Sequence, residues 1–213
     1  MMTPTAMVFV IDDDQSMRKS LERLLDAASY KVELFKSASE FLSRPAHPGP
    51  SCVVVDVRMP GLNGIDLQNA LIESGREEQL VFITGHGDIA MCAGAMKAGA
   101  VDFLSKPFKP KQLLESVERA LTHSAEQRHR ASEKNHARAL LARLTPREYE
   151  VMQFIAMGLL NKQVGSELGM AEKTVKTHRA HVMQKLKITS VAELMVVLQK
   201  AEVTPPIRPG TKV

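Results

Sequence analysis

The 213-residue sequence has few aromatic residues, few cysteines and no long apolar run. Tryptophan is absent and aromatic residues make up 4% of the chain, which argues against the base-stacking platforms that bind single-stranded nucleic acid. The two cysteines, Cys52 and Cys92, are too few for a disulfide framework and are typical of small buried residues in a reducing compartment. No apolar run approaches the ~20 residues that span a bilayer. Residues 1–7 lack the basic cluster of a signal peptide, so we expect a cytoplasmic protein without membrane contact.

Charge is distributed unevenly along the chain. Apolar residues make up 44% and charged residues 24%, which suits a protein with a buried core. Up to Leu121 there are 13 basic and 16 acidic residues, a balance of −3, whereas from Thr122 onward there are 15 and 8, a balance of +7. The basic second half predicts a polyanion as its partner, with unevenly scattered surface charge as the alternative.

The first half alternates between strand and helix patterns. Short apolar, β-branched runs recur at residues 7–11, 31–35, 52–57, 80–84 and 101–104. Helical patterns separate them, and one places Met17, Leu21 and Leu25 on a single stripe. This alternation predicts a doubly wound α/β domain, with a five-stranded parallel sheet covered by helices on both faces.

The second half has only helical patterns. Residues 122–138 are charged and contain no proline or glycine, which predicts a solvated helical linker. Thr145, Pro146 and Glu148 combine an N-cap hydroxyl, a proline at the first helical position and the acidic partner of a capping box. Two helices that flank a tight turn at Gly169 are typical of a small all-α helix-turn-helix domain. The predicted organisation is an α/β domain at 1–121, the linker at 122–138, a helix-turn-helix domain at 139–203 and a disordered tail at 204–213.

Reactive side chains follow four strands of the predicted sheet. Three consecutive aspartates, residues 12–14, follow the first strand, and Asp56 lies near the end of the third, its neighbour in a doubly wound sheet. Crowded carboxylates repel one another unless a cation bridges them, and oxygen ligands of this kind fit Mg²⁺. Thr84 closes the fourth strand and Lys106 follows the fifth. A carboxylate nucleophile, a metal, an ammonium and a hydroxyl together predict a phosphoryl-transfer site.

The motifs at these strand ends resemble the receiver domain of two-component response regulators. The matching segments are IDDD at the first strand, VVVDVRMPGLNG around the third, ITGHGD at the fourth and DFLSKPF at the fifth. The resemblance covers residues 7–121, and MKAGAVDFLSKPF is most similar to the FixJ-type subgroup. It implies a flavodoxin-like receiver fold and a sensor histidine kinase that phosphorylates Asp56.

The resemblance also implies a metal site and a phosphoryl-binding lysine. Asp13 and Asp56 would bind Mg²⁺ directly. Asp12 would act through water, and the backbone carbonyl of Arg58 would be a further ligand. Lys106 would hold the phosphoryl group.

The resemblance further implies the geometry of one peptide bond and a pair of switch residues. The bond between Lys106 and Pro107 is expected to be cis, which aims the lysine side chain. Thr84 and Phe103 match the family's switch pair, whose movement reshapes the surface on which FixJ-like proteins dimerise. Asp14 is expected to cap the following helix rather than bind metal.

A basic helix dominates the second half. Residues 161–187 contain six basic and two acidic side chains, and no acid follows Thr174 in that stretch. Because residues three or four apart share a helix face, Lys173, Lys176 and Thr177 lie together. Such a face fits the DNA major groove, where lysines bind phosphates and Lys176 and Thr177 reach base edges. On charge alone, a solvated amphipathic helix is the alternative.

The order of motifs in this half resembles the LuxR/NarL-type helix-turn-helix. The segment LTPREYEVMQFIAMGLLNKQVGSELGMAEKTVKTHRAHVMQKL carries the resemblance, which implies double-stranded promoter DNA as a partner. The residues expected to bind this DNA are Asn161, Lys162, Thr174, Lys176, Thr177, His178 and Arg179. Leu160 stands where serine is common and Gly165 where alanine is usual, and the glycine is expected to cost about 0.5–1 kcal/mol of helix stability.

These features predict a transcription regulator that is switched by phosphorylation and is not an enzyme. Phosphorylation of Asp56 would produce a homodimer whose two helix-turn-helix domains bind a two-fold-related DNA site, with RNA polymerase as a further partner. One alternative is a magnesium-dependent phosphatase with an aspartyl nucleophile, which would want a second acid where Arg58 stands. The other is a receiver-type adaptor without DNA output.

Overall fold

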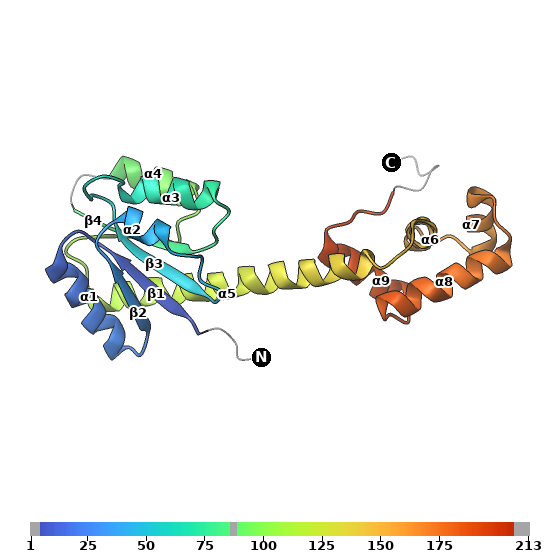
Figure 1. Cartoon of the computed structure of the whole chain (residues 1–213), viewed down its shortest axis with the longest axis horizontal. Helices are drawn as coiled ribbons and strands as arrows, with labels where there is room; N and C mark the ends of the chain where they lie inside the picture. The colour runs from blue at the N-terminus through green and yellow to red at the C-terminus, as the bar shows by residue number, and fades with distance from the viewer. Residues whose placement is uncertain (1–4, 86–88, 207–213) are drawn as a thin grey trace. The chain divides into compact units, whose positions relative to one another are not determined.

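The computed structural model describes residues 5–85 and 89–206 (Figure 1). The chain forms two compact units that divide after Arg128, called unit 1 and unit 2 below. Unit 1 contains β1 (Met7–Ile11), α1 (Gln15–Ala27), β2 (Lys31–Phe35), α2 (Ala38–Ser43), β3 (Ser51–Asp56), α3 (Gly64–Glu73), β4 (Gln79–Thr84), α4 (Ile89–Lys97), β5 (Asp102–Ser105) and the first part of α5 (Pro110–Leu141). Unit 2 contains the rest of α5, followed by α6 (Pro146–Ala156), α7 (Asn161–Leu168), α8 (Glu172–Leu186) and α9 (Val191–Ala201).

The sheet of unit 1 confirms the predicted doubly wound fold. Its strands are parallel and lie in the order β2-β1-β3-β4-β5, so the chain reverses its direction of winding next to β1. The strands β3 and β4 begin one residue before the predicted ranges, at Ser51 and Gln79. Both residues are polar and buried, and a pattern of apolar residues therefore does not include them.

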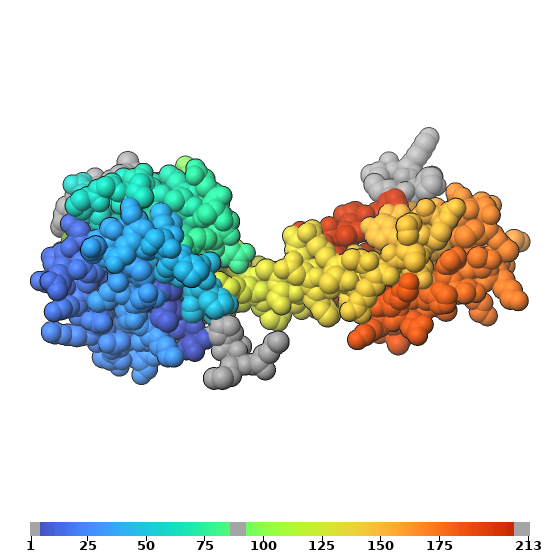
Figure 2. All heavy atoms as spheres, viewed as in Figure 1, coloured from blue at the N-terminus to red at the C-terminus, as the bar shows by residue number. Residues whose placement is uncertain are grey.

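Helices cover both faces of this sheet, as the side chains of β1 show by pointing alternately to one face and the other. Val8 and Val10 pack on the face covered by α1 and α5, whereas Phe9 and Ile11 pack on the face covered by α2 and α3 (Figure 1). All four side chains are fully buried. In Figure 2, the side chains of α2 and α3 form the visible surface over the sheet face on which Phe9 and Ile11 pack. Each fully buried side chain of this size contributes about 1.5–3 kcal/mol.

The turn into α3 places backbone close to the end of β3. Asn63 caps α3 by accepting hydrogen bonds from the backbone N–H groups of Ile65 and Asp66 at 2.8 and 2.9 Å. The next residue, Gly64, lies so close to β3 that a Cβ atom there would be 2.8 Å from the carbonyl oxygen of Asp56. A side chain at this position would therefore displace the strand end that carries Asp56.

Helix α5 runs without a break through the predicted linker. Its residues near Ser124 still pack on unit 1, where the buried Ser124 hydroxyl accepts a hydrogen bond from the backbone of Ser51 at 3.0 Å. Arg128 donates hydrogen bonds to the carbonyls of His47 and Pro48 at 2.6 and 3.1 Å. The two compact units thus divide inside the predicted linker, and the predicted domain boundaries stay predictions. Residues 207–213 of the predicted tail lie outside the described residues.

Unit 2 packs its helices around one apolar core that includes Val151, Val175, Val182 and Leu194. Helix α6 begins with the predicted capping box, in which Thr145 and Glu148 each accept a hydrogen bond from the other's backbone N–H. Gly169 ends α7 in the left-handed conformation, with φ of 65°, which glycine adopts without strain. The turn into α8 is thereby tight, as a helix-turn-helix requires.

Among the helices in the described part of the chain, none combines the length and apolarity needed to cross a membrane.

Candidate functional sites

The structure brings the predicted acidic and basic side chains together at the carboxyl ends of β1, β3 and β5. The Nζ atom of Lys106 lies 2.5 Å from Oδ2 of Asp56 and 3.2 Å from Oδ2 of Asp12. Asp12 is 2% exposed and Asp56 is 9% exposed, so both carboxylates are largely removed from water. One ammonium group therefore contacts two buried carboxylates and balances the charge of only one of them.

Backbone groups fix the orientation of these side chains. Asp12 accepts a hydrogen bond from the backbone of Asp14 at 2.8 Å, and Asp56 accepts one from the backbone of Arg58 at the same distance. The peptide bond between Lys106 and Pro107 is cis, as the resemblance implied. Each acidic group thus keeps one oxygen on the backbone and turns the other toward Lys106.

The pKa values of Asp12 and Lys106 reflect both their burial and their mutual attraction. Burial raises the pKa of Asp12, because the hydrogen bond from Asp14 and the charge of Lys106 only partly offset the loss of water. Burial alone would lower the pKa of Lys106. The hydrogen bond to Asp56 and the two carboxylate charges outweigh that effect, so the pKa of Lys106 is raised. The lysine is accordingly a stable cation at neutral pH.

The three aspartates at residues 12–14, called the acidic loop below, provide oxygen ligands, but their carboxylates do not gather in one cluster. Asp13 is exposed, whereas Asp12 and Asp56 both contact Lys106. Within the described side chains there is no group of three His, Cys, Asp or Glu residues placed to hold a metal. Two carboxylates that share one ammonium still leave excess negative charge and offer only oxygen atoms, a donor set that fits Mg²⁺.

The two predicted switch residues lie on neighbouring strands. Thr84 ends β4, is 1% exposed and accepts a hydrogen bond through its backbone carbonyl from Lys106 N–H at 2.6 Å. Phe103 lies on β5 opposite Phe82, is half-buried and packs against the apolar core. The structure therefore places Thr84 next to the backbone of Lys106, and Phe103 on the neighbouring edge strand against the apolar core.

Arg18 belongs to this site and was not predicted from the sequence. Its guanidinium donates hydrogen bonds to the backbone carbonyls of Asp12 and Asp13, at 2.6 and 2.9 Å. These bonds fasten the acidic loop to α1. The position of Arg18 one turn beyond Asp14, the N-cap of that helix, is the signal that could have identified it. Asp14 itself caps α1, as expected, by accepting hydrogen bonds from Ser16 and Met17.

The residues predicted to bind DNA lie on α7 and α8 of unit 2. Four of them are exposed, namely Lys162, Thr174, Lys176 and Thr177. The other three, Asn161, His178 and Arg179, are half-buried. The opposite side of α8 is buried in the core through Val175, Val182 and Leu186. Helix α8 thus has the exposed basic face that the sequence predicted.

An ion pair between the buried Glu148 and the partly exposed Lys185 holds α8 against α6. Glu148 is 4% exposed and accepts a hydrogen bond from Lys185 Nζ at 2.6 Å. The Nδ1 atom of His181 lies 3.6 Å from its other oxygen. The hydrogen bonds from Lys185 and from the backbone of Thr145 lower the pKa of Glu148 to about 2. The sequence predicted Glu148 as a helix cap but gave no sign of this second role.

The two departures from the helix-turn-helix pattern have structural consequences. Leu160 is the N-cap of α7, is 70% exposed and provides no side-chain hydrogen bond to the helix. At Gly165, a Cβ atom would lie 2.6 Å from the carbonyl oxygen of Met170. The expectation that glycine only costs stability at this position was therefore wrong, since the turn packs against the bare Cα atom.

A parallel sheet with an aspartate–lysine site at its carboxyl edge, followed by a basic helix-turn-helix unit, defines a receiver that controls a DNA-binding domain. Comparison with known families agrees. Residues 8–118 match the response regulator receiver domain, and residues 142–198 match the luxR family of bacterial regulatory proteins. The chain belongs to the two-component response regulators with a LuxR-type DNA-binding domain, and it is a transcriptional response regulator.

Relatives match along nearly the whole chain. Nodulation protein W of Bradyrhizobium diazoefficiens is 46% identical over 89% of this chain and 84% of its own length. The transcriptional regulatory protein FixJ of the same species is 40% identical over 94% of this chain and 98% of its own length. The solved structure of the response regulator StyR is 45% identical, with a TM-score of 0.84 over 92% of this chain and 99% of its own.

Proposed function

We propose that Asp56 is the residue to which a sensor histidine kinase transfers a phosphoryl group. The position of Lys106, 2.5 Å from Asp56 and 3.2 Å from Asp12, carries this proposal. It brings a carboxylate nucleophile and a positive charge together at the edge of the sheet, which is the arrangement that phosphoryl transfer uses.

In the transfer, an oxygen of Asp56 attacks phosphorus while the P–N bond to the kinase histidine breaks, and the histidine keeps that electron pair. Lys106 then moves its hydrogen bond from the carboxylate to a phosphoryl oxygen. Asp13 and Asp56 would hold Mg²⁺ directly. The Arg58 carbonyl would be a further ligand, and Asp12 would act through water. When bound there, the metal neutralises charge on the phosphoryl oxygens.

The phosphoryl group would be read by the two switch residues. The Thr84 hydroxyl would move toward a phosphoryl oxygen, and Phe103 would turn inward into the space next to β4. Phe103 is only half-buried and lies on the edge strand, so this rotation changes the surface formed by α4, β5 and α5. We propose that two receivers pair on that surface to form a homodimer.

Pairing would increase DNA affinity because it links two weak contacts. One helix-turn-helix unit contacts few phosphates and bases, whereas two linked units gain from the effective concentration of the second one. The dimer would bind a two-fold-related site in double-stranded promoter DNA through α7 and α8, and RNA polymerase would be its partner there.

The site favours a signalling role over an enzymatic one. A phosphatase with an aspartyl nucleophile would want an acid two residues after Asp56, and Arg58 stands there. The basic face of α8 in turn favours DNA output over a receiver that acts only as an adaptor.

The solution mass of the full chain tests this proposal, measured with and without beryllofluoride or acetyl phosphate in the presence of Mg²⁺. We expect the wild type to change from monomer to dimer, and Asp56→Asn to stay monomeric because its amide is no nucleophile. Asp26→Asn, an exposed aspartate on α1, is the matched control and should behave like the wild type.

Uptake of the phosphoryl group is measured in the acetyl phosphate samples by intact-protein mass. Uptake by Asp56→Asn would show that another residue is the acceptor. A wild type that takes up no phosphoryl group would overturn the phosphorylation mechanism. Uptake without dimerisation would overturn only the proposed pairing.

A further inference from the structure

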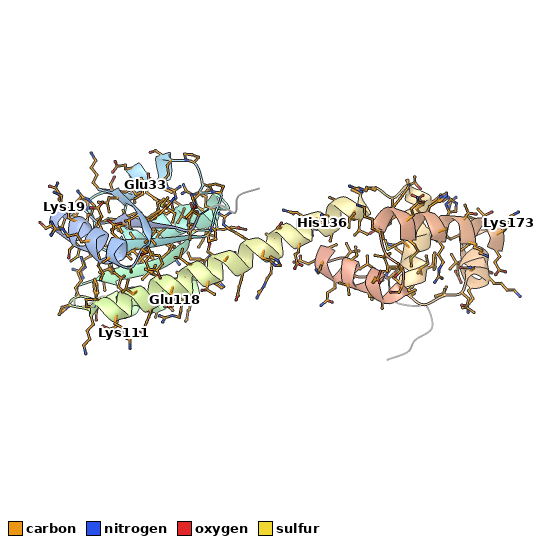
Figure 3. All side chains as sticks on the ribbon, turned by 90° about the horizontal axis from the view of Figure 1, so that it is seen from below. Lys19, Glu33, Lys111, Glu118, His136 and Lys173 are labelled. Carbon is orange, nitrogen blue, oxygen red and sulfur yellow. The ribbon has the colours of Figure 1, made fainter. Side chains whose placement is uncertain are left out.

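The exposed face of α8 carries two small side chains, Thr177 and Ala180, beside its lysines. The exposed side chains that face away from the core are Lys173, Lys176, Thr177, Ala180 and Gln184. Lys173 lies in the first turn of the helix and extends from it into solvent (Figure 3). The polar side chains on the flank toward α6 are already engaged, since His181 and Lys185 both contact Glu148.

The hydroxyl group of Thr177 is bonded to the helix itself. It donates a hydrogen bond to the backbone carbonyl of Lys173 at 3.1 Å, a local bond that threonine often makes within helices. Its donor is therefore committed, so the side chain offers a ligand its methyl group and an oxygen that can only accept a hydrogen bond. Ala180, three residues further on, adds a second exposed methyl group on the same face.

The spacing of these two methyl groups fits DNA. Side chains three residues apart on a helix are separated by roughly 5–6 Å between Cβ atoms. Successive bases on one strand are about 3.4 Å apart along the axis. Two methyl groups on α8 can therefore meet bases that lie one or two steps apart.

Only one natural base offers an apolar group in the major groove. Thymine presents its 5-methyl group there, whereas the other bases present hydrogen-bond donors and acceptors. We infer that Thr177 and Ala180 read thymine methyl groups, and that the half-site of this regulator contains thymines one or two steps apart beneath the middle of α8. The inference rests on the proposed DNA-binding role of α8 and specifies what that helix recognises.

The test uses the full-length phosphorylated chain and the duplex that it selects from a random pool. Each thymine of the half-site is replaced in turn by deoxyuridine, which removes only the 5-methyl group. We expect an affinity loss of about fourfold at one or two positions, as burial of one methyl group implies.

Two substitutions at the same residue separate the methyl group from the hydroxyl. Thr177→Val keeps a methyl group and lacks the hydroxyl, so it should retain the sensitivity to deoxyuridine. Thr177→Ser keeps the hydroxyl and lacks the methyl group, so it should bind the thymine duplex less tightly and lose the sensitivity. Lys162→Ala, which removes a phosphate contact, should weaken both duplexes equally and thus leave their affinity ratio unchanged.

The possible outcomes distinguish the inference from the function on which it rests. If every deoxyuridine duplex binds as tightly as its thymine parent, the inferred recognition of methyl groups is wrong while the proposed DNA binding stands. The same conclusion follows if Thr177→Val loses affinity and Thr177→Ser does not. If no sequence is enriched from the pool and no salt-dependent duplex binding is found, the proposed DNA-binding role fails as well.

Discussion

Replacing Glu148 with glutamine tests how α8 is held in position. The substitution keeps the size of the side chain but removes the charge that pairs with Lys185 at 2.6 Å. The pKa of Glu148 falls from 4.5 to about 2 in the folded chain. A depressed pKa means that the folded state binds its proton less tightly than the unfolded state, so the ion pair stabilises unit 2 at neutral pH.

The magnitude follows from the size of this shift. The decrease of the Glu148 pKa from 4.5 to about 2 corresponds to about 3 kcal/mol in the free energy of unfolding at neutral pH. Lys185 is 35% exposed, and solvent screening reduces the expected value to about 2–3 kcal/mol. The contribution is complete above pH 4.5 and is lost as the pH falls toward 2, so about half of it is left near pH 3.

The assay exploits the lack of tryptophan and the two tyrosines. In a Tyr30→Phe background, Tyr149 is the one remaining tyrosine and packs against the core of unit 2, so its fluorescence reports urea unfolding of that unit. Glu148→Gln should lower the free energy of unfolding by about 2–3 kcal/mol at pH 7 and by about half as much at pH 3. Glu150→Gln, whose partner Arg147 is exposed, should have almost no effect. A loss that is equal at the two pH values would refute the reasoning.

Three further substitutions test the structural roles of single residues. Leu160→Ser should stabilise unit 2 by about 1 kcal/mol, because serine provides the N-cap acceptor that α7 lacks and the leucine is 70% exposed, and a decrease in Tyr149-monitored stability would contradict this. Gly165→Ala should destabilise unit 2 by about 1–3 kcal/mol in the same assay, because its Cβ atom would lie 2.6 Å from the Met170 carbonyl; the 0.5–1 kcal/mol gain expected from helix preference alone would contradict the contact. Arg128→Ala should lower the stability of unit 1 by about 1–2 kcal/mol, measured by Tyr30 fluorescence in a Tyr149→Phe background, and leave unit 2 unchanged, measured by Tyr149 fluorescence in a Tyr30→Phe background. A change confined to unit 2 would show that Arg128 does not belong to unit 1.

The sequence predicted the parts of the fold that depend on apolar periodicity. The five strands and α8 have strong patterns, and the strand order follows from the rules for doubly wound sheets. The site could be predicted because Asp12, Asp56 and Lys106 each follow a strand, and parallel strands bring their carboxyl ends to one edge. The pairing of Lys185 with Glu148 could not be predicted in this way, because 37 positions separate the two residues and either charge could equally have been solvated.

The predicted linker shows why a polar sequence does not identify the residues that pack against a folded unit. Residues 122–138 have a charged sequence without apolar periodicity, yet Ser124 is buried and Arg128 bonds to two carbonyls of unit 1. Further along the same helix, Glu133 pairs with Lys200 and Lys134 pairs with Glu202 in unit 2. These contacts use hydrogen bonds and charges, which leave no apolar signature in the sequence. The division between the two units after Arg128 therefore falls inside α5, between the hydrogen bonds of Arg128 to unit 1 and the ion pairs of Glu133 and Lys134 with unit 2.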